Sequence, residues 1–120
     1  MALPERQPSN EVAVFAPPMT DISTAGSVYA AAPVSGMLVR AYSSISAAIT
    51  TADCTWTMKI NAVAVTGTAT ITQASSAAGD CDELIFSAPV FVNKGDKLEW
   101  VSGGESDTTS IGAFSCVIRT

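Results

Sequence analysis

The sequence predicts an all-β protein: a single-domain antiparallel β-sandwich, or jelly roll, with an extended N-terminal arm. Three observations support this fold class. Residues 54–60 (CTWTMKI) alternate apolar and polar side chains, with the period of two that is typical of a half-buried strand. Turn-forming residues recur along the rest of the chain at intervals of about 8–12 residues, as they do in β-sandwiches and β-barrels. No stretch keeps a helical period over ten residues.

The first 22 residues differ from the rest, because they hold four of the six prolines. Proline lacks the backbone N–H that a sheet needs, and it also interrupts helices. We therefore predict an extended, Pro-rich arm over residues 1–22, with a possible edge strand at 11–15, and a sandwich domain over 23–120. The arm is either a frayed tail or a segment that lies along a neighbouring protein.

Short strands are expected along the remainder of the chain, each rich in the β-branched, aromatic or small apolar residues that suit a pleated sheet. Their predicted ranges are 27–32, 37–45, 54–60, 63–65, 69–72, 84–86, 90–92, 98–101 and 111–118.

Two local features refine these strands. In the strand at 37–45, alternation places Met37, Val39 and Ala41 on one face and the intervening residues on the other. A tight turn is expected at Asn61 and the residue after it, because Asn tolerates the left-handed backbone region.

The composition narrows the classes of function. Charged residues make up 14% of the 120 residues, against about 25% in a typical globular protein. Such a chain has little charge for a free surface, so part of that surface is expected to be covered by copies of itself or by a partner. A formal charge of −5 with only six basic residues argues against nucleic-acid binding.

The chain shows no sign of a membrane segment or of a secretion signal. Its apolar runs are far shorter than the ~20 residues that a membrane-spanning helix needs. The first residues, MALPERQPSNE, lack the basic and apolar regions of a signal peptide. We therefore expect synthesis and folding in a cytoplasm.

The three cysteines, Cys54, Cys81 and Cys116, are an odd number and form no CxxC pair. Secreted disulfide scaffolds usually have an even and denser set. We expect buried thiols that pack as small apolar side chains, in a reducing compartment. The alternative is one disulfide and one free thiol.

No constellation for catalysis is evident, and we predict that the protein is not an enzyme and has no cofactor or metal. The chain has no histidine, which excludes Ser–His and Cys–His nucleophile pairs. The densest acidic cluster is 80–83 (DCDE), which either binds Ca²⁺ or is a solvated loop that enters a strand. The loop interpretation is favoured, and the same holds for Glu105 and Asp107.

The two tryptophans present a similar choice. Trp56 shares an alternating apolar face with Met58 and Ile60, which predicts a core position. Trp100 is expected at a rim or an interface. The alternative for both is an aromatic platform for a sugar, which requires that they be exposed.

Six short motifs follow one another between residues 23 and 118. They are 29–36 (YAAAPVSG), 41–43 (AYS), 49–61 (ITTADCTWTMKIN), 65–71 (VTGTATI), 75–80 (SSAAGD) and 92–98 (VNKGDKL). In this order and spacing the chain resembles the small head decoration, or capsid cement, proteins of tailed bacteriophages. Residues 83–90 and the Pro-rich arm have no clear counterpart in the family pattern.

The resemblance implies a jelly-roll-like sandwich that forms a homotrimer at threefold positions on the exterior of a phage head. Its partner would be the major capsid protein, and its function would be to bind and stabilise the expanded capsid. The arm is then the candidate capsid contact, through Pro4, Pro8, Val12, Val14, Phe15, Pro17 and Pro18. Alternatives are a trimeric jelly-roll receptor- or glycan-binding module of a virion or surface structure, and a carbohydrate-binding sandwich attached to an enzyme.

Overall fold

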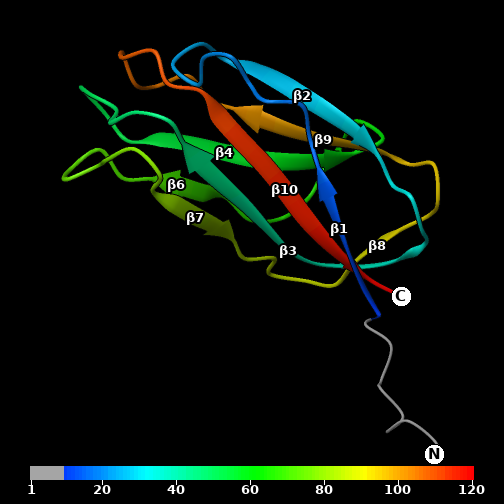
Figure 1. Cartoon of the computed structure of the whole chain (residues 1–120). Helices are drawn as coiled ribbons and strands as arrows, with labels where there is room; N and C mark the ends of the chain where they lie inside the picture. The colour runs from blue at the N-terminus through cyan, green and yellow to red at the C-terminus, as the bar shows by residue number, and fades with distance from the viewer. Residues whose placement is uncertain (1–9) are drawn as a thin grey trace, which may run out of the picture.

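The structure of the protein, a computed structural model, describes residues 10–120, which contain ten strands and no helix. The strands form two five-stranded antiparallel sheets that pack as a sandwich (Figure 1). Sheet A contains β1 (Glu11–Phe15), β3 (Gly36–Ile45), β7 (Cys81–Leu84), β8 (Val90–Val92) and β10 (Gly112–Arg119). Sheet B contains β2 (Gly26–Ala31), β4 (Cys54–Ile60), β5 (Val63–Ala64), β6 (Ala69–Ile71) and β9 (Lys97–Ser102).

The strand order is that of a hairpin rolled into a sandwich. β1 pairs with β10, β2 with β9, β3 with both β7 and β8, and β4 with both β5 and β6. The first half of the chain thus pairs with the second half in reverse order, and successive pairs belong to alternate sheets. This is the topology of a jelly roll, so the predicted fold class is confirmed.

The strand β3 contains a β-bulge that changes which residues face the core. Val117 pairs with Arg40, but the next residue, Ile118, pairs with Leu38, so that Val39 is an extra residue in β3. An extra residue reverses the alternation on one side of the bulge. Leu38 and Ala41 are therefore both buried, and the strict alternation predicted for this strand is wrong.

The strand predicted at 84–86 lies earlier in the chain than expected. In β7, Cys81 pairs with Ser44 and Leu84 pairs with Ala41. Leu84 is fully buried, whereas Ile85 is 74% exposed and lies outside the strand. The acidic segment 80–83 is therefore mostly a strand, because pairing with β3 and burial of Leu84 determine the register.

The described part of the predicted arm belongs to the sandwich. Figure 1 shows β1 beside β10 at the edge of sheet A, which confirms the edge strand expected at 11–15. Pro17 and Pro18 end this strand, but Met19 then exchanges two backbone hydrogen bonds with Gly112, of 2.8 and 2.9 Å. Met19 and Ile22 are buried in the core, at 6% and 0% exposure. The sandwich thus begins before residue 23, contrary to the predicted boundary.

The turn between β4 and β5 is as predicted. Asn61 and Ala62 both have positive φ, of 50° and 69°, the geometry of a two-residue type I′ hairpin turn. The Asn61 side chain donates to Asp96 Oδ1 at 3.0 Å and accepts the Lys97 backbone N–H at 2.9 Å. These contacts join the β4–β5 hairpin to the turn that precedes β9.

Both tryptophans belong to sheet B and lie in the core, at 1% and 0% exposure. The core position predicted for Trp56 is confirmed, and the rim or interface position expected for Trp100 is wrong. The Trp56 indole N–H donates to Ser43 Oγ of sheet A at 3.0 Å, and the ring meets Phe114 of sheet A edge-on, with centroids 5.2 Å apart. The Trp100 indole N–H donates to the Ser115 backbone oxygen at 3.2 Å.

Replacing Ser43 with Ala should destabilise the protein by about 1–3 kcal/mol, because the buried Trp56 N–H would lose its acceptor. The free energy of unfolding is measured by urea denaturation monitored through tryptophan fluorescence. Ser44→Ala is the matched control, since Ser44 is the next residue of β3 and faces away from the core; its cost should stay below about 0.5 kcal/mol. Equal costs for the two variants would contradict a stabilising role of the Trp56 hydrogen bond.

Candidate interaction surfaces

The arm residues predicted as partner contacts divide into three groups. Pro4 and Pro8 lie outside the described residues. Val14 is 7% exposed and packs in the core, so its side chain is not available to a partner. Val12 is half-buried on the same face of β1. The accessible residues are Phe15, which is 73% exposed, and the exposed Pro17 and Pro18.

Phe15 borders a shallow hollow of about 260 Å³ on the outer face of sheet A. The other walls include Tyr42, Ser44 and Cys81, which project outward from neighbouring strands, and Ala113 of β10. None of the lining residues carries a charge. These residues are far apart in the sequence, and no sequence pattern groups them, because their proximity depends on the pairing of β1, β10, β3 and β7.

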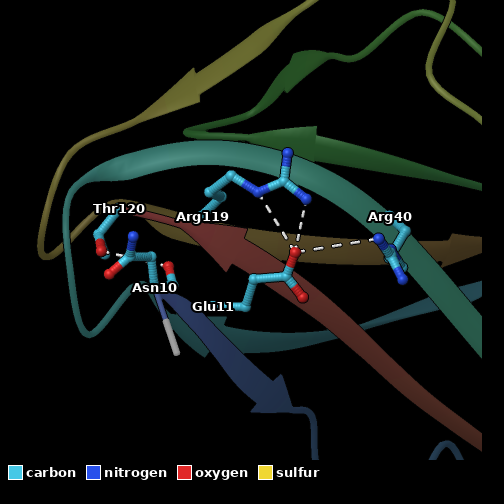
Figure 2. Close-up of polar contacts among 5 residues, drawn as sticks. All are labelled: Asn10, Glu11, Arg40, Arg119 and Thr120. Carbon is cyan, nitrogen blue, oxygen red and sulfur yellow. Dashed lines mark hydrogen bonds and ion pairs between the residues drawn. The ribbon is translucent and has the colours of Figure 1, made fainter. Parts of the chain in front are cut away.

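A small charged cluster lies at the other end of this face (Figure 2). Arg119 Nη2 and Nε donate to Glu11 Oε2 at 2.6 and 3.2 Å, and Arg40 Nη2 lies 3.9 Å from the same oxygen. The adjacent Thr120 N–H donates to the Asn10 backbone oxygen at 2.7 Å. These contacts connect the first residues of β1 to the end of β10.

The hydrogen bond from Arg119 lowers the pKa of the Glu11 carboxyl, and the positive charges of Arg119 and Arg40 add to this effect. A carboxyl whose pKa is lower in the folded than in the unfolded state stabilises the fold above the unfolded pKa. That contribution is lost as the pH falls through the lowered, folded-state pKa. The attachment of β1 to β10 is thus stronger at neutral pH than in acid.

The acidic residues of the loops mainly accept hydrogen bonds from neighbouring segments. Glu105 accepts the backbone N–H and the hydroxyl of Thr55, at 3.0 and 2.5 Å. Asp107 accepts the hydroxyl of Thr51 at 2.7 Å. In the acidic cluster at 80–83, burial raises the pKa of the Asp82 carboxyl, with a smaller contribution from the charge of Asp80. Within residues 10–120, no three Cys, Asp or Glu side chains come together as metal ligands.

The tryptophans offer no platform for a sugar, because both are buried. The exposed aromatic side chains of the described residues belong instead to Phe15, Tyr29 and Phe91, on three different strands. The Lys97 ammonium lies 5.6 Å from the centre of the Tyr29 ring, on the outer face of sheet B. Among residues 10–120, no helix has the length and apolar character that a membrane crossing requires.

The cysteines are all free thiols but differ in accessibility. Cys54 and Cys116 are buried in the core, as predicted, whereas Cys81 is exposed at the hollow, contrary to the prediction of buried thiols. Burial raises the pKa of the Cys116 thiol to about 12. Because thiolates react with disulfide reagents and thiols do not, Cys116 is protected by both its burial and its protonation.

One thiol per chain should therefore react rapidly with 5,5′-dithiobis(2-nitrobenzoate) at pH 8 in the native protein. All three should react in denaturant, as measured by absorbance at 412 nm. The Cys81→Ser variant should show almost no rapid reaction in the native state and two reactive thiols after unfolding. Rapid native labelling of this variant would mean that Cys54 or Cys116 is accessible.

No family model matches the chain, and neither a curated protein nor a solved structure is significantly similar to it.

Proposed function

We propose that the protein decorates the head of a tailed bacteriophage, where it binds the outer surface of the expanded capsid and stabilises it without catalysis. The observation that carries this proposal is the ordered set of six motifs between residues 23 and 118. The jelly-roll topology agrees with the fold that the resemblance implies. A chain with 14% charged residues also suits a protein whose surface is largely covered in an assembly.

The proposed mechanism is additive interface energy. A homotrimer at a threefold position presents three copies of the same contact to neighbouring capsomers. Once one contact has formed, the other two form at high effective concentration, so each needs only a modest affinity. Such a trimer binds tightly only where the distance between its binding sites on neighbouring capsomers matches the trimer. This requirement explains why the trimer would prefer the expanded lattice to the unexpanded one.

The capsid-facing element is proposed to be the accessible part of the arm. Phe15 is a large apolar side chain that is 73% exposed at the edge of sheet A, next to an uncharged hollow. Covering a Phe side chain contributes about 1.5–3 kcal/mol. In a trimer, three copies of this contact add to one another once the first has formed.

The proposal predicts saturable binding of the purified protein to undecorated, expanded heads of the phage that encodes it. Bound copies, counted by quantitative gel densitometry after sedimentation, should equal three per threefold and quasi-threefold position. Decorated heads should also release their DNA at a higher temperature than bare heads. Unexpanded heads are the control and should bind far less. Protein that stays in the supernatant with expanded heads would overturn the proposal in favour of a receptor- or glycan-binding module, which is expected in few copies per particle.

The arm contact is tested separately with Phe15→Ser, which should weaken binding to expanded heads by at least about tenfold, as expected for one buried Phe side chain. Tyr29→Ser is the control, because Tyr29 is an exposed aromatic residue on the other sheet. A second variant lacks residues 2–9 and keeps β1, since a longer deletion would remove buried residues such as Val14 and Met19. Unchanged binding of both arm variants would show that the capsid contact lies elsewhere.

A further inference from the structure

A second uncharged surface lies on the side of the sandwich where both sheets have an interrupted edge. The strand that pairs with β4 is broken between β5 and β6, and the strand that pairs with β3 is broken between β7 and β8. The two breaks contact one another at Gly67, where a Cβ would lie 2.7 Å from the Ile85 backbone oxygen. Gly67 also has a φ of 118°, which L side chains rarely adopt.

A groove of about 350 Å³ lies beside these breaks. One wall comes from the β4–β5 hairpin through Ile60, Val63 and Val65, and the other from Pro89 and Phe91 at the start of β8. All of the lining residues are uncharged, and Thr66 is the only polar one.

Two large apolar side chains in this groove are open to solvent. Val63 is 69% exposed and Phe91 is 74% exposed. Ile85, which is also 74% exposed, lies in the neighbouring break between β7 and β8. Single exposed apolar side chains are common on proteins, but a group of them around a groove is typical of a binding site.

The wall formed by β5 also has backbone groups available to a partner. The Val65 N–H donates to the Met58 oxygen at 3.0 Å, and residues along an antiparallel strand alternate in direction. The N–H and C=O of Ala64 therefore face away from β4. Within the described residues, β5 pairs with β4 alone, so this edge is open to an added strand.

The size of the groove argues for a short occupant. A stable protein–protein interface uses about 20–30 residues on each side and buries roughly 800 Å² per partner. The groove is lined by nine residues, which is enough for a short segment in extended conformation, whereas a second globular copy of this chain would need contacts well beyond the groove. A charged segment is disfavoured, because the groove holds no opposite charge to offset its desolvation.

We propose that this groove binds a short, extended and uncharged segment of a partner protein, which adds to β5 at Ala64 and places alternate apolar side chains between Val63 and Phe91. This surface is separate from the arm contact proposed for Phe15.

The test begins with selection of random heptapeptides displayed on a carrier against the immobilised, full-length protein. Enriched peptides should be uncharged and should carry β-branched or aromatic residues at alternate positions. A synthetic copy of one enriched peptide is then titrated into ¹⁵N-labelled protein. The amide of Ala64 and its neighbours in the groove should shift in a saturable manner.

Variants of the groove provide the decisive comparison. Val63→Ser and Phe91→Ser should each weaken binding of this peptide at least tenfold, and both should fold, because the two side chains are mostly exposed. Phe15→Ser is a closely matched control: Phe15 and Phe91 are the same residue type with 73% and 74% exposure. Its peptide affinity should stay within about twofold of that of the unsubstituted protein.

Three results would overturn the proposal: no enrichment above an unrelated immobilised protein, equal affinity of the groove variants and Phe15→Ser, or shifts outside the groove. A lower oligomeric state of Phe91→Ser in sedimentation velocity would also overturn it, because a second copy would then cover the groove. The peptide measurements use no phage heads, so their outcome is independent of the head-binding assay.

Discussion

The two tryptophan side chains of sheet B must satisfy their indole N–H groups inside a core that excludes water, and both do so on sheet A. Trp56 donates to Ser43 and Trp100 donates to the backbone oxygen of Ser115. A buried N–H without an acceptor costs about 1–3 kcal/mol, so each bond favours one placement of the sheets over displaced ones. Phe114 meets the Trp56 ring edge-on, which restricts the same placement through packing. This placement of the two sheets determines which residues of each strand face the core. Because side chains alternate along a strand, it also determines which residues face outward.

The rolled hairpin gives the two sides of the sandwich different properties. On one side, β1 completes sheet A and is joined to β10 by the contacts of Glu11 with Arg119. On the other side, the edge strands of both sheets are interrupted, and Gly67 allows the interruptions to pack together. Exposed strand edges commonly attract other chains. Phe15 of the proposed capsid contact belongs to β1 on the first side, and the proposed peptide groove lies on the second, so the two can be tested with independent substitutions.

Low charge is the property that links the composition to these surfaces. The hollow beside Phe15 and the groove beside Phe91 are both lined entirely by uncharged residues. Several acidic side chains instead accept hydrogen bonds that connect loops to neighbouring segments. Glu105 accepts from Thr55 of β4, and Asp107 accepts from Thr51, which precedes β4. In both proposals above, a partner covers one of these uncharged surfaces.

The parts of this fold that depend on local chemistry could be predicted from the sequence. Strict alternation identified Cys54–Ile60 and the core position of Trp56, and the tolerance of Asn61 for the left-handed backbone region identified the turn after β4.

The features that depend on pairing between distant segments could not be predicted from the sequence. The bulge at Val39 arises from the register with β10, and the strand Cys81–Leu84 from the register with β3. Likewise, Met19 is a core residue because of its bridge to Gly112. The groove forms only because the break between β5 and β6 contacts the break between β7 and β8, which is distant in the sequence. A period-two pattern specifies that a strand has an apolar face, but pairing with the neighbouring strands of its sheet determines where that strand begins and which residue is extra. Packing against the other sheet then determines which side chains remain exposed.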